Sequence, residues 1–453
     1  MYLEVGDVPC PSVAASVRSP FECVCVCVCV CECVCLCQEV DPACRQLIVD
    51  HHKWLSSFTG HCSRLPCVFG DIMEQLDGTV DMSRGSFECK RRRVTAAALQ
   101  RYQYCTTHAQ PCCVDTPVML DVSGLPCPDN SRANHGRLFE EGPSGKIYIT
   151  WAAQHKRKQT PLLILENVRD MNMTAIAALL EDDYLVIPLK VSPTDVGHDG
   201  ISRDRLYVFC SHRKTGRYLY DVHEAYACVS KKLRRYIQTR PRDYFVASDR
   251  DIHLDALRIA AQRRVQFVPE SRLKKLLCFQ HVRSLCCYPV QHVWVAQGAD
   301  DLSYLLNSRE LEQKEAYECL YRQRFGSNAE EDEDCCVYLG DNVRWTVTWS
   351  ASSGRIPTLR RSSGRMWNNS RKRWMCPVEK LACHGYPVTK EAASVLGVPA
   401  LPVLDPLRAD SVCGNSMHFS NCALVLLCGL TCFGARLQRD SADLLDWSSL
   451  RGC

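Results

Sequence analysis

The stretch PLLILENV, residues 161–168, decides the fold, and GLPCPDNSR, residues 124–132, is the second stretch on which the prediction depends. Consecutive aliphatic residues make the first stretch a buried strand that ends by presenting Glu166. A shorter strand, VMLDV (residues 118–122), is closed by Ser123 and Gly124, so the chain enters a loop just before Pro126 and Cys127. Ligands of open α/β sheets bind outside the carboxyl ends of strands. We therefore expect the Cys127 thiol and the Glu166 carboxyl to share one cleft.

The neighbouring segments predict an α/β fold. Residues 138–156 read as a helix between the two strands, which gives a strand, helix, strand crossover. YLVIPLKV (residues 184–191) is a further buried strand. At 453 residues the chain can bury a large core and allows two or three domains.

Thirty-two cysteines would ordinarily suggest a secreted disulfide scaffold, but their distribution argues against one. Residues 23–37 alternate Cys and Val almost strictly, like a translated dinucleotide repeat, and predict neither helix nor strand. The other cysteines lack paired CxxC spacing, and some lie in apolar segments as small hydrophobic residues. We expect a reducing, intracellular setting, nuclear in a eukaryotic cell, and no metal site. The start does not predict a signal peptide, and the apolar tracts are too short to span a bilayer, so no membrane partner is expected.

The pair formed by Pro126–Cys127 and Glu166–Asn167–Val168 resembles the nucleophile and proton-handling motifs of the cytosine-C5 DNA methyltransferases. Arg203 and Arg205, in GISRDRLYVFC, are similar to the family's Gln-x-Arg-x-Arg, with Ile201 in the Gln position. Pro128 stands where the family usually has Gln. The resemblance implies a Rossmann-like S-adenosylmethionine-dependent methyltransferase sheet with an inserted, smaller target-recognition domain. The catalytic residues it implies are Cys127, Glu166, Asn167, Arg203 and Arg205.

Weaker motifs follow in the family's order. QEVDPAC resembles the motif whose acid binds the cofactor ribose, VFGDI the motif that binds adenine, and GNSMH the last motif, which precedes a closing apolar helix. MCPVEKLACHGYP and IPTLRRSS resemble motifs where the chain returns to the catalytic domain. The family's glycine-rich turn for S-adenosylmethionine has no counterpart, and the Val-Cys repeat occupies its place. The implied cofactor-binding residues are Glu39, Asp71, Ile72, Pro126, Asn415 and Ser416.

Basic residues interleaved with aromatic residues fill the region between His212 and Trp374, which suits phosphate contacts and base stacking. In position this region corresponds to the family's target-recognition region. We therefore predict four parts: a low-complexity, disordered or mispredicted segment (1–36), a catalytic part (37–212), a target-recognition region (213–372), and the return to the catalytic domain (373–453). The predicted DNA-binding residues are Ser131, Arg132, Arg234, Arg235 and Arg361.

The resemblance implies transfer of a methyl group from S-adenosylmethionine to C5 of a flipped-out cytosine in DNA. In this chemistry the Cys127 thiolate adds to C6, Glu166 acts at N3, Arg203 and Arg205 orient the base, and Asn167 holds the Cys127 loop. Three alternatives remain: a tRNA cytosine-C5 methyltransferase, a catalytically impaired DNA-binding relative without a cofactor loop, and a cysteine-rich metal or redox protein.

Overall fold

The computed structural model describes residues 25–28, 35–59, 65–132, 134–265, 301–360, 366–396, 400–401 and 406–436. The chain forms two compact units. Unit 1 comprises the described residues within Met1–Val191, Asp204–Val229 and Cys422–Cys453, and unit 2 those within Ser192–Arg203 and Ser230–Asn421.

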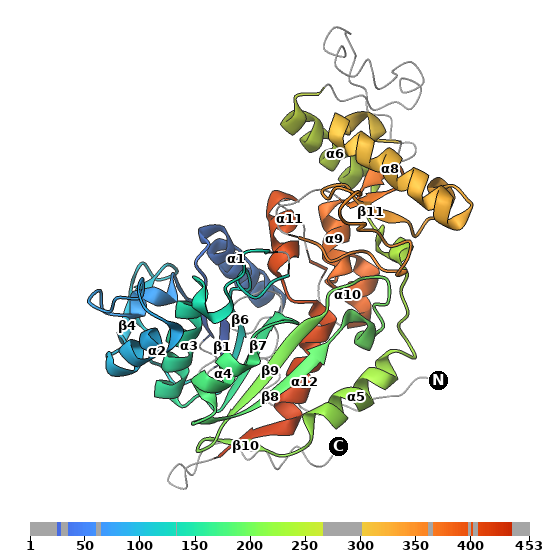
Figure 1. Ribbon diagram of the computed structural model, residues 1–453. Helices are drawn as coiled ribbons and strands as arrows, with labels where there is room; N and C mark the ends of the chain where they lie inside the picture. Colours follow the sequence, from blue (N-terminus) through green and yellow to red (C-terminus); the bar gives the residue numbers. More distant parts are fainter. Residues whose placement is uncertain are drawn as a thin grey trace. The chain divides into compact units, whose positions relative to one another are not determined.

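Unit 1 is built on a nine-stranded sheet in the order β5-β4-β3-β2-β1-β6-β7-β9-β8 (Figure 1). β2 and β3 are parallel, β6 and β7 are parallel, and β1 lies antiparallel between β2 and β6. Four strands therefore end at the same edge of the sheet: β2, β3, β6 and β7. The strands are β1 Cys25–Val28, β2 Cys35–Gln38, β3 Cys67–Phe69, β4 Tyr102–Cys105, β5 Gln110–Cys113, β6 Leu120–Gly124, β7 Leu162–Val168, β8 Tyr184–Val191 and β9 Arg205–His212.

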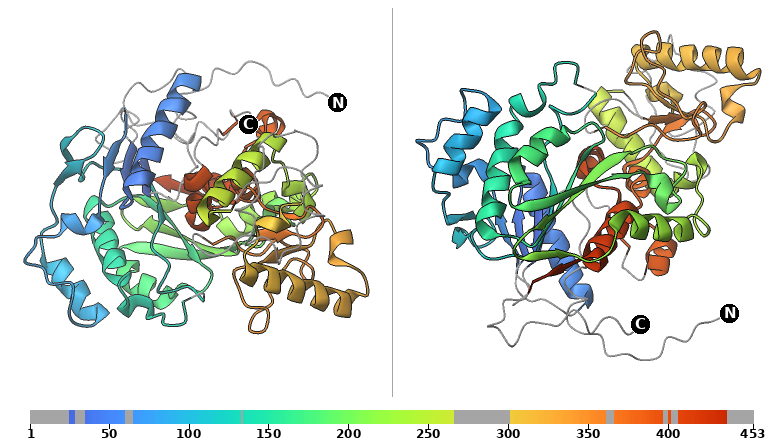
Figure 2. Two further views of the ribbon diagram at one scale, coloured as in Figure 1. Left: turned by 90° about the horizontal axis from the view of Figure 1, so that it is seen from above. Right: turned by 60° about the horizontal axis from the view of Figure 1, so that its bottom comes forward.

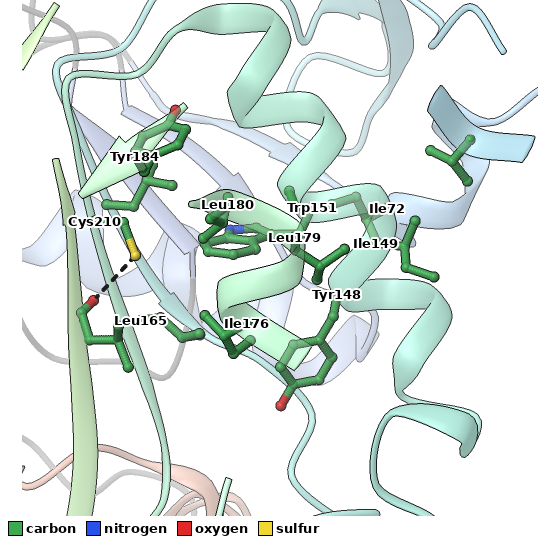
Figure 3. Close-up of a cluster of buried hydrophobic side chains, with 14 of the residues drawn as sticks. Ile72, Tyr148, Ile149, Trp151, Leu165, Ile176, Leu179, Leu180, Tyr184 and Cys210 are labelled. Atoms are coloured by element: carbon green, nitrogen blue, oxygen red, sulfur yellow. Dashed lines mark hydrogen bonds between the residues drawn. The ribbon is translucent and has the colours of Figure 1, made fainter. Parts of the chain in front are cut away.

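Helices cover both faces of this sheet because side chains alternate along each strand (Figures 1 and 2). Leu163 and Leu165 of β7 belong to a buried cluster with residues of α2, α3 and α4 (Figure 3). Ile164 faces the other way, towards α12, where a Cβ added to Gly429 would lie 2.8 Å from its Cδ1. The helices of this unit are α1 Pro42–Thr59, α2 Phe87–Ala96, α3 Gly145–Lys158, α4 Met173–Leu180 and, from Cys422 onward, α12 Phe419–Cys432.

Local signals explain where these helices begin. Asp41 accepts the backbone N–H of Ala43 at the start of α1, and Asn172 accepts that of Thr174 at the start of α4. The crossovers β2-α1-β3 and β6-α3-β7-α4-β8 confirm the predicted α/β, Rossmann-like class.

One prediction about the amino-terminal segment is wrong. The Val-Cys repeat was expected to form no strand, yet it supplies β1 and most of β2. Its strict alternation has the period of a strand, and valine is β-branched, so the composition favours an extended chain next to an existing sheet. Because β1 is antiparallel to β6, it ends at the edge opposite to the end of β6.

Unit 2 combines a three-stranded sheet with helices around a buried cluster of mainly aromatic and aliphatic residues. Arg373 and Glu379 form an ion pair inside it, with Nη2 to Oε1 at 2.7 Å and both side chains almost fully buried. The elements are β11 Cys336–Tyr338, β12 Met366–Asn368, β13 Arg373–Trp374, α6 Asp249–Arg263, α8 Ser308–Phe325, α9 Pro377–Cys383, α10 Lys390–Leu396 and α11 Pro406–Asn415. α5 Val222–Leu233 joins the two units, and β10 Gly216–Tyr218 pairs with β14 Phe433–Ala435 in unit 1. Within the described ranges no helix is both long and apolar enough to cross a bilayer.

Candidate active site

The ends of β6 and β7 bring the two central stretches together. The strands pair in register, with Gly124 opposite Glu166. The Cys127 loop therefore begins beside the strand end that carries Glu166 and Asn167. Cys127 itself is half-buried, whereas Asn167 is only 1% exposed.

Two buried side chains hold the start of the Cys127 loop. Asn167 donates from Nδ2 to the carbonyl of Leu125 at 2.9 Å, and the Tyr148 hydroxyl donates to the carbonyl of Pro126 at 3.0 Å. Asn167 also donates to the Tyr148 oxygen at 2.8 Å, which couples the two contacts. Burial raises the pKa of Tyr148, and the nearby Cys127 sulfur adds to this rise, so Tyr148 keeps its proton and remains a donor.

The continuation of the loop folds back on itself. The backbone N–H groups of Asn130 and Ser131 donate to the Cys127 carbonyl at 3.0 and 2.9 Å. Asp129, 6% exposed, accepts the N–H of Ser144 at 2.8 Å, just before α3. The carbonyl oxygens and acidic side chain of the loop are thus occupied by protein donors.

Glu166 and Arg205 form a shielded ion pair. The distance from Arg205 Nε to Glu166 Oε1 is 2.9 Å, and the side chains are 14% and 8% exposed. β9 runs antiparallel to β7, which brings Arg205 opposite Val168 and within reach of the carboxylate.

Arg203, also predicted to orient the base, bonds to backbone carbonyls of a distant segment. It is 2% exposed and donates from Nη2 to the carbonyls of Ser416 and Gly414 within unit 2. Its neighbour Ser202 donates its N–H to the carbonyl of Ile356, the first residue of the predicted return strand. Ile356 forms a single β-bridge with Ile201, and the described residues 357–360 form no strand. Ser416 is also buried, and Asn415 is the last residue of α11.

The acids predicted to bind a cofactor follow neighbouring strand ends. Glu39 comes directly after β2, and its N–H donates to the carbonyl of Phe69, the last residue of β3. Its Oε1 accepts the N–H of Asp41 at 2.8 Å, and burial raises its pKa. Asp71 caps a short 3₁₀ helix by accepting the N–H of Met73 at 2.9 Å. The side chain of Ile72, 9% exposed, packs in the core cluster of unit 1 (Figure 3).

These residues fit part of S-adenosylmethionine. Carboxylates at two adjacent strand ends have the acceptor chemistry that ribose hydroxyls and an adenine amino group need. Asp71 Oδ1 already accepts the backbone N–H of Met73, so Oδ2 is the oxygen that would accept a hydrogen bond from the adenine amino group. No described parallel strand lies between β2 and β6, where a glycine-rich turn would be needed for the methionine part.

The predicted DNA-binding residues that the structure describes are divided between the two units. Ser131 follows the Cys127 loop, and the exposed Arg132 pairs with Asp170, with Nη2 to Oδ1 at 2.8 Å. Arg234 and Arg235 are exposed just after α5, in unit 2. Arg361 lies outside the described residues.

Three residues of the site were missed by the sequence analysis. Tyr148, Asp129 and Asn130 are buried and fix the Cys127 loop through the bonds above. Asn130 also accepts the N–H of Asn172, the cap of α4, at 3.2 Å. Asp129 and Asn130 follow Cys127 directly in sequence and could have been included, whereas nothing in the helix pattern marks Tyr148.

No protein-family model matches the sequence, and no curated protein matches it significantly. Several solved structures are similar to the chain. The Dnmt2 methyltransferase of S. pombe is 11% identical, with 69% of this chain and 76% of that chain covered and a TM-score of 0.33. The methyltransferase EhMeth of Entamoeba histolytica is 12% identical (69% and 77% covered, TM-score 0.32), and a Spodoptera frugiperda DNMT2 mutant is 11% identical (87% and 91%, 0.35).

Proposed function

We propose that this chain is a DNA cytosine-C5 methyltransferase that uses S-adenosylmethionine and a covalent Cys127 adduct. The observation that carries the proposal is the arrangement at the ends of β6 and β7: a half-buried thiol on a clamped loop, next to a shielded Glu166–Arg205 pair.

A thiol is the group this reaction needs. Cytosine C5 is too weak a nucleophile to accept a methyl group unaided, so the Cys127 thiolate adds to C6 and the ring electrons move to C5. After C5 has taken the methyl group, loss of the C5 proton and breakage of the C6–S bond restore the aromatic ring and the thiolate. S-adenosylmethionine supplies the methyl group when bound.

Glu166 has the position and chemistry for the pyrimidine N3. A carboxyl group that binds or protonates N3 stabilises the electron-rich ring formed by thiolate addition. Arg205 keeps this carboxyl oriented by its 2.9 Å contact and offers further donors to the base. Asn167 and Tyr148 bond to the carbonyls of Leu125 and Pro126 and so fix the position of the loop relative to the end of β7. This orients the Cys127 thiol for attack.

For the cofactor, Glu39 would accept the ribose hydroxyls and Asp71 the adenine amino group. The other residues expected to bind the cofactor, Ile72, Pro126, Asn415 and Ser416, stay predictions for this role. The antiparallel β1 favours a second candidate: a relative that binds DNA but holds the cofactor weakly or not at all.

DNA is proposed as the substrate because the long basic region offers phosphate contacts, with Arg234 and Arg235 exposed in it. A stacked base cannot reach the Cys127 thiol, so the cytosine must be flipped out of the duplex. A tRNA substrate would leave the same chemistry unchanged.

The test is covalent trapping on 5-fluorocytosine. Fluorine cannot leave C5 as a cation, so an enzyme that has added its thiol and transferred a methyl group stays bound. We expect a denaturation-resistant adduct with fluorocytosine DNA and S-adenosylmethionine, none with Cys127→Ser, and an unchanged adduct with Cys89→Ser, whose thiol is exposed on α2.

The other outcomes separate the alternatives. An adduct only on fluorocytosine tRNA would replace DNA by tRNA as substrate. An adduct that persists in Cys127→Ser would remove Cys127 from the mechanism. DNA binding without any adduct, together with no calorimetric S-adenosylmethionine binding, would establish the catalytically impaired relative.

A further inference from the structure

Four side chains of metal-ligating types lie close together at the β5-β4-β3 end of the sheet, away from β7, which carries Glu166. They are Cys67 on β3, Cys105 on β4, Cys112 on β5 and His108 in the turn between β4 and β5, and their ligand atoms all lie within 4.8 Å of one another. None of them is used by the proposed methyl transfer.

Strand register explains why three residues from different strands share one face. Phe69 pairs with Cys105, so Cys67, two residues before Phe69, points to the same side of the sheet. Cys105 pairs with Gln110, so Cys112, two residues after Gln110, points there too. The four-residue turn between β4 and β5 then brings His108 over the three sulfurs.

The distances have the values of a tetrahedral site. His108 Nδ1 lies 3.5 Å from Cys67 Sγ, 3.4 Å from Cys105 Sγ and 3.5 Å from Cys112 Sγ. A tetrahedral zinc with bonds of about 2.3 Å to sulfur and about 2.0 Å to nitrogen would have an S···N edge of about 3.5 Å. All three sulfur–nitrogen edges therefore already match.

Hydrogen bonding alone does not account for this arrangement. The imidazole Nδ1 has one lone pair when its proton is on Nε2, so it can accept one S–H donor, not three. A metal ion between the three sulfurs and the nitrogen would account for all three distances. Apolar packing explains part of the site, because Cys105 is fully buried in a small cluster with Leu36 and Phe69, but it gives no reason for an imidazole there.

We propose that Cys67, Cys105, His108 and Cys112 bind one zinc ion in a closed structural site. Three sulfur ligands and one imidazole are typical of zinc, and four protein ligands leave no open position for catalysis. The thiols release their protons when the metal binds. This proposal does not rest on the proposed methyl transfer.

The site would fasten the β4–β5 hairpin to β3. The hairpin in turn supports the loop after β3, because Gln103 of β4 donates to the carbonyl of Asp71 and to Glu74 Oε2, both at 2.9 Å. Removal of the metal is therefore expected to loosen the hairpin first and the Asp71 loop second.

The test is to measure the zinc content of the full chain by elemental mass spectrometry after purification without added metal or chelator. We expect about one zinc per chain, and its loss in Cys67→Ser, Cys112→Ser and His108→Gln. Cys113→Ser is the matched control, because Cys113 is also half-buried but alternates to the other face of β5; it should keep the zinc.

Cobalt substitution gives a second readout that needs no variant to fold. Cobalt(II) added to the zinc-stripped chain should give the intense visible absorption of a tetrahedral site and a thiolate-to-cobalt band in the near ultraviolet. Absence of that spectrum, equal zinc content in all variants, or a disulfide between two of the three cysteines in the chain purified without reductant would each overturn the proposal.

Discussion

The Tyr148 hydroxyl joins the α3 helix to the Cys127 loop. Its ring packs in the core cluster of unit 1, and the oxygen points away from that cluster toward the strand ends (Figure 3). It donates to the Pro126 carbonyl and accepts from Asn167, so it positions the loop without needing to touch a substrate.

We predict that Tyr148→Phe slows adduct formation while the protein stays folded. The substitution keeps the ring but leaves the Pro126 carbonyl without this donor, which should lower the free energy of unfolding by about 1–3 kcal/mol. A positioning role predicts a lower kcat with little change in KM. Urea unfolding and single-turnover trapping measure both effects.

The matched control is Tyr317→Phe in unit 2, which removes a buried hydroxyl that donates to the Thr348 carbonyl at 3.2 Å. It should lose similar stability and keep the trapping rate. Equal trapping rates in Tyr148→Phe and the wild type would contradict the positioning role.

His155, on α3, is a buried histidine in unit 1. His155 is fully buried, with Nε2 3.5 Å from Asp121 Oδ1 and Nδ1 3.0 Å from Thr160 Oγ1. Burial is the largest cause that lowers its pKa to about 4, although Asp121 acts in the opposite direction. The imidazole is therefore neutral in the folded protein at neutral pH.

This predicts an acid-sensitive contribution to stability. The unfolded chain protonates His155 below about pH 6.5, whereas the folded chain does so only below about pH 4, so between these values the unfolded state binds more protons. The free energy of unfolding should fall by about 3 kcal/mol from this residue as pH drops through that window. His155→Gln should lose less stability over the same window. Unfolding curves of both proteins that shift in parallel from pH 7 to pH 4 would contradict the prediction.

At the scale of elements, the segment from Cys127 to the start of α3 is held by contacts between its own two ends. Asp129 accepts the N–H of Ser144, and the N–H of Phe139 donates to the Asp129 carbonyl at 3.0 Å. Gly142 lies so close that an added Cβ would be 2.3 Å from Asp129 Cγ. The far end of this segment is thus packed against Asp129, two positions after Cys127.

We predict that Gly142→Ala disturbs this segment. The backbone of Gly142, at φ −72° and ψ 176°, suits alanine, so the effect comes from the clash with Asp129. A loss of about 1–3 kcal/mol in unfolding free energy and a slower trapping reaction are expected. Gly78→Ala is the control, because Gly78 is exposed and an added Cβ there would meet nothing within 4 Å. Unchanged stability and an unchanged trapping rate in Gly142→Ala would contradict the prediction, because they would mean that the segment accommodates the added methyl group.

At the scale of the whole molecule, the candidate catalytic residues and two of the predicted DNA-binding arginines belong to different units. Cys127, Glu166 and Arg205 belong to unit 1, and the exposed Arg234 and Arg235 belong to unit 2. The excess of basic over acidic residues is only +4, so phosphate binding depends on local groups of this kind.

We predict that the double variant Arg234→Ala, Arg235→Ala weakens DNA binding uniformly across sequences. Each lost phosphate contact should reduce the slope of log K against log salt concentration by about 0.9, so the double variant should lose up to about 2. Fluorescence anisotropy at several salt concentrations measures this slope. Arg250→Ala, an exposed arginine on α6, is the control, and an unchanged slope in the double variant would remove this pair from the DNA contacts.

The sequence by itself predicted a strand at residues 118–122, which the structure has at Leu120–Gly124, and a strand at residues 161–168, which the structure has at Leu162–Val168. It also predicted the loop that carries Cys127 and the α/β class, because these follow from local periodicity and turn residues. It also predicted the pairing of the Cys127 loop with Glu166, since neighbouring parallel strands end at one edge.

Only the tertiary structure decided the contacts between distant positions. Tyr148 reaches Pro126 because α3 crosses back over β6, Arg205 reaches Glu166 through the register of β9, and Arg203 bonds to carbonyls more than two hundred residues away. The Val-Cys repeat became strands because a sheet was there to pair with it. Cys105, His108 and Cys112 lie within eight residues of one another in the sequence, but Cys67 lies far from them along the chain, and only the pairing of β3 with β4 brings all four ligand atoms within 4.8 Å.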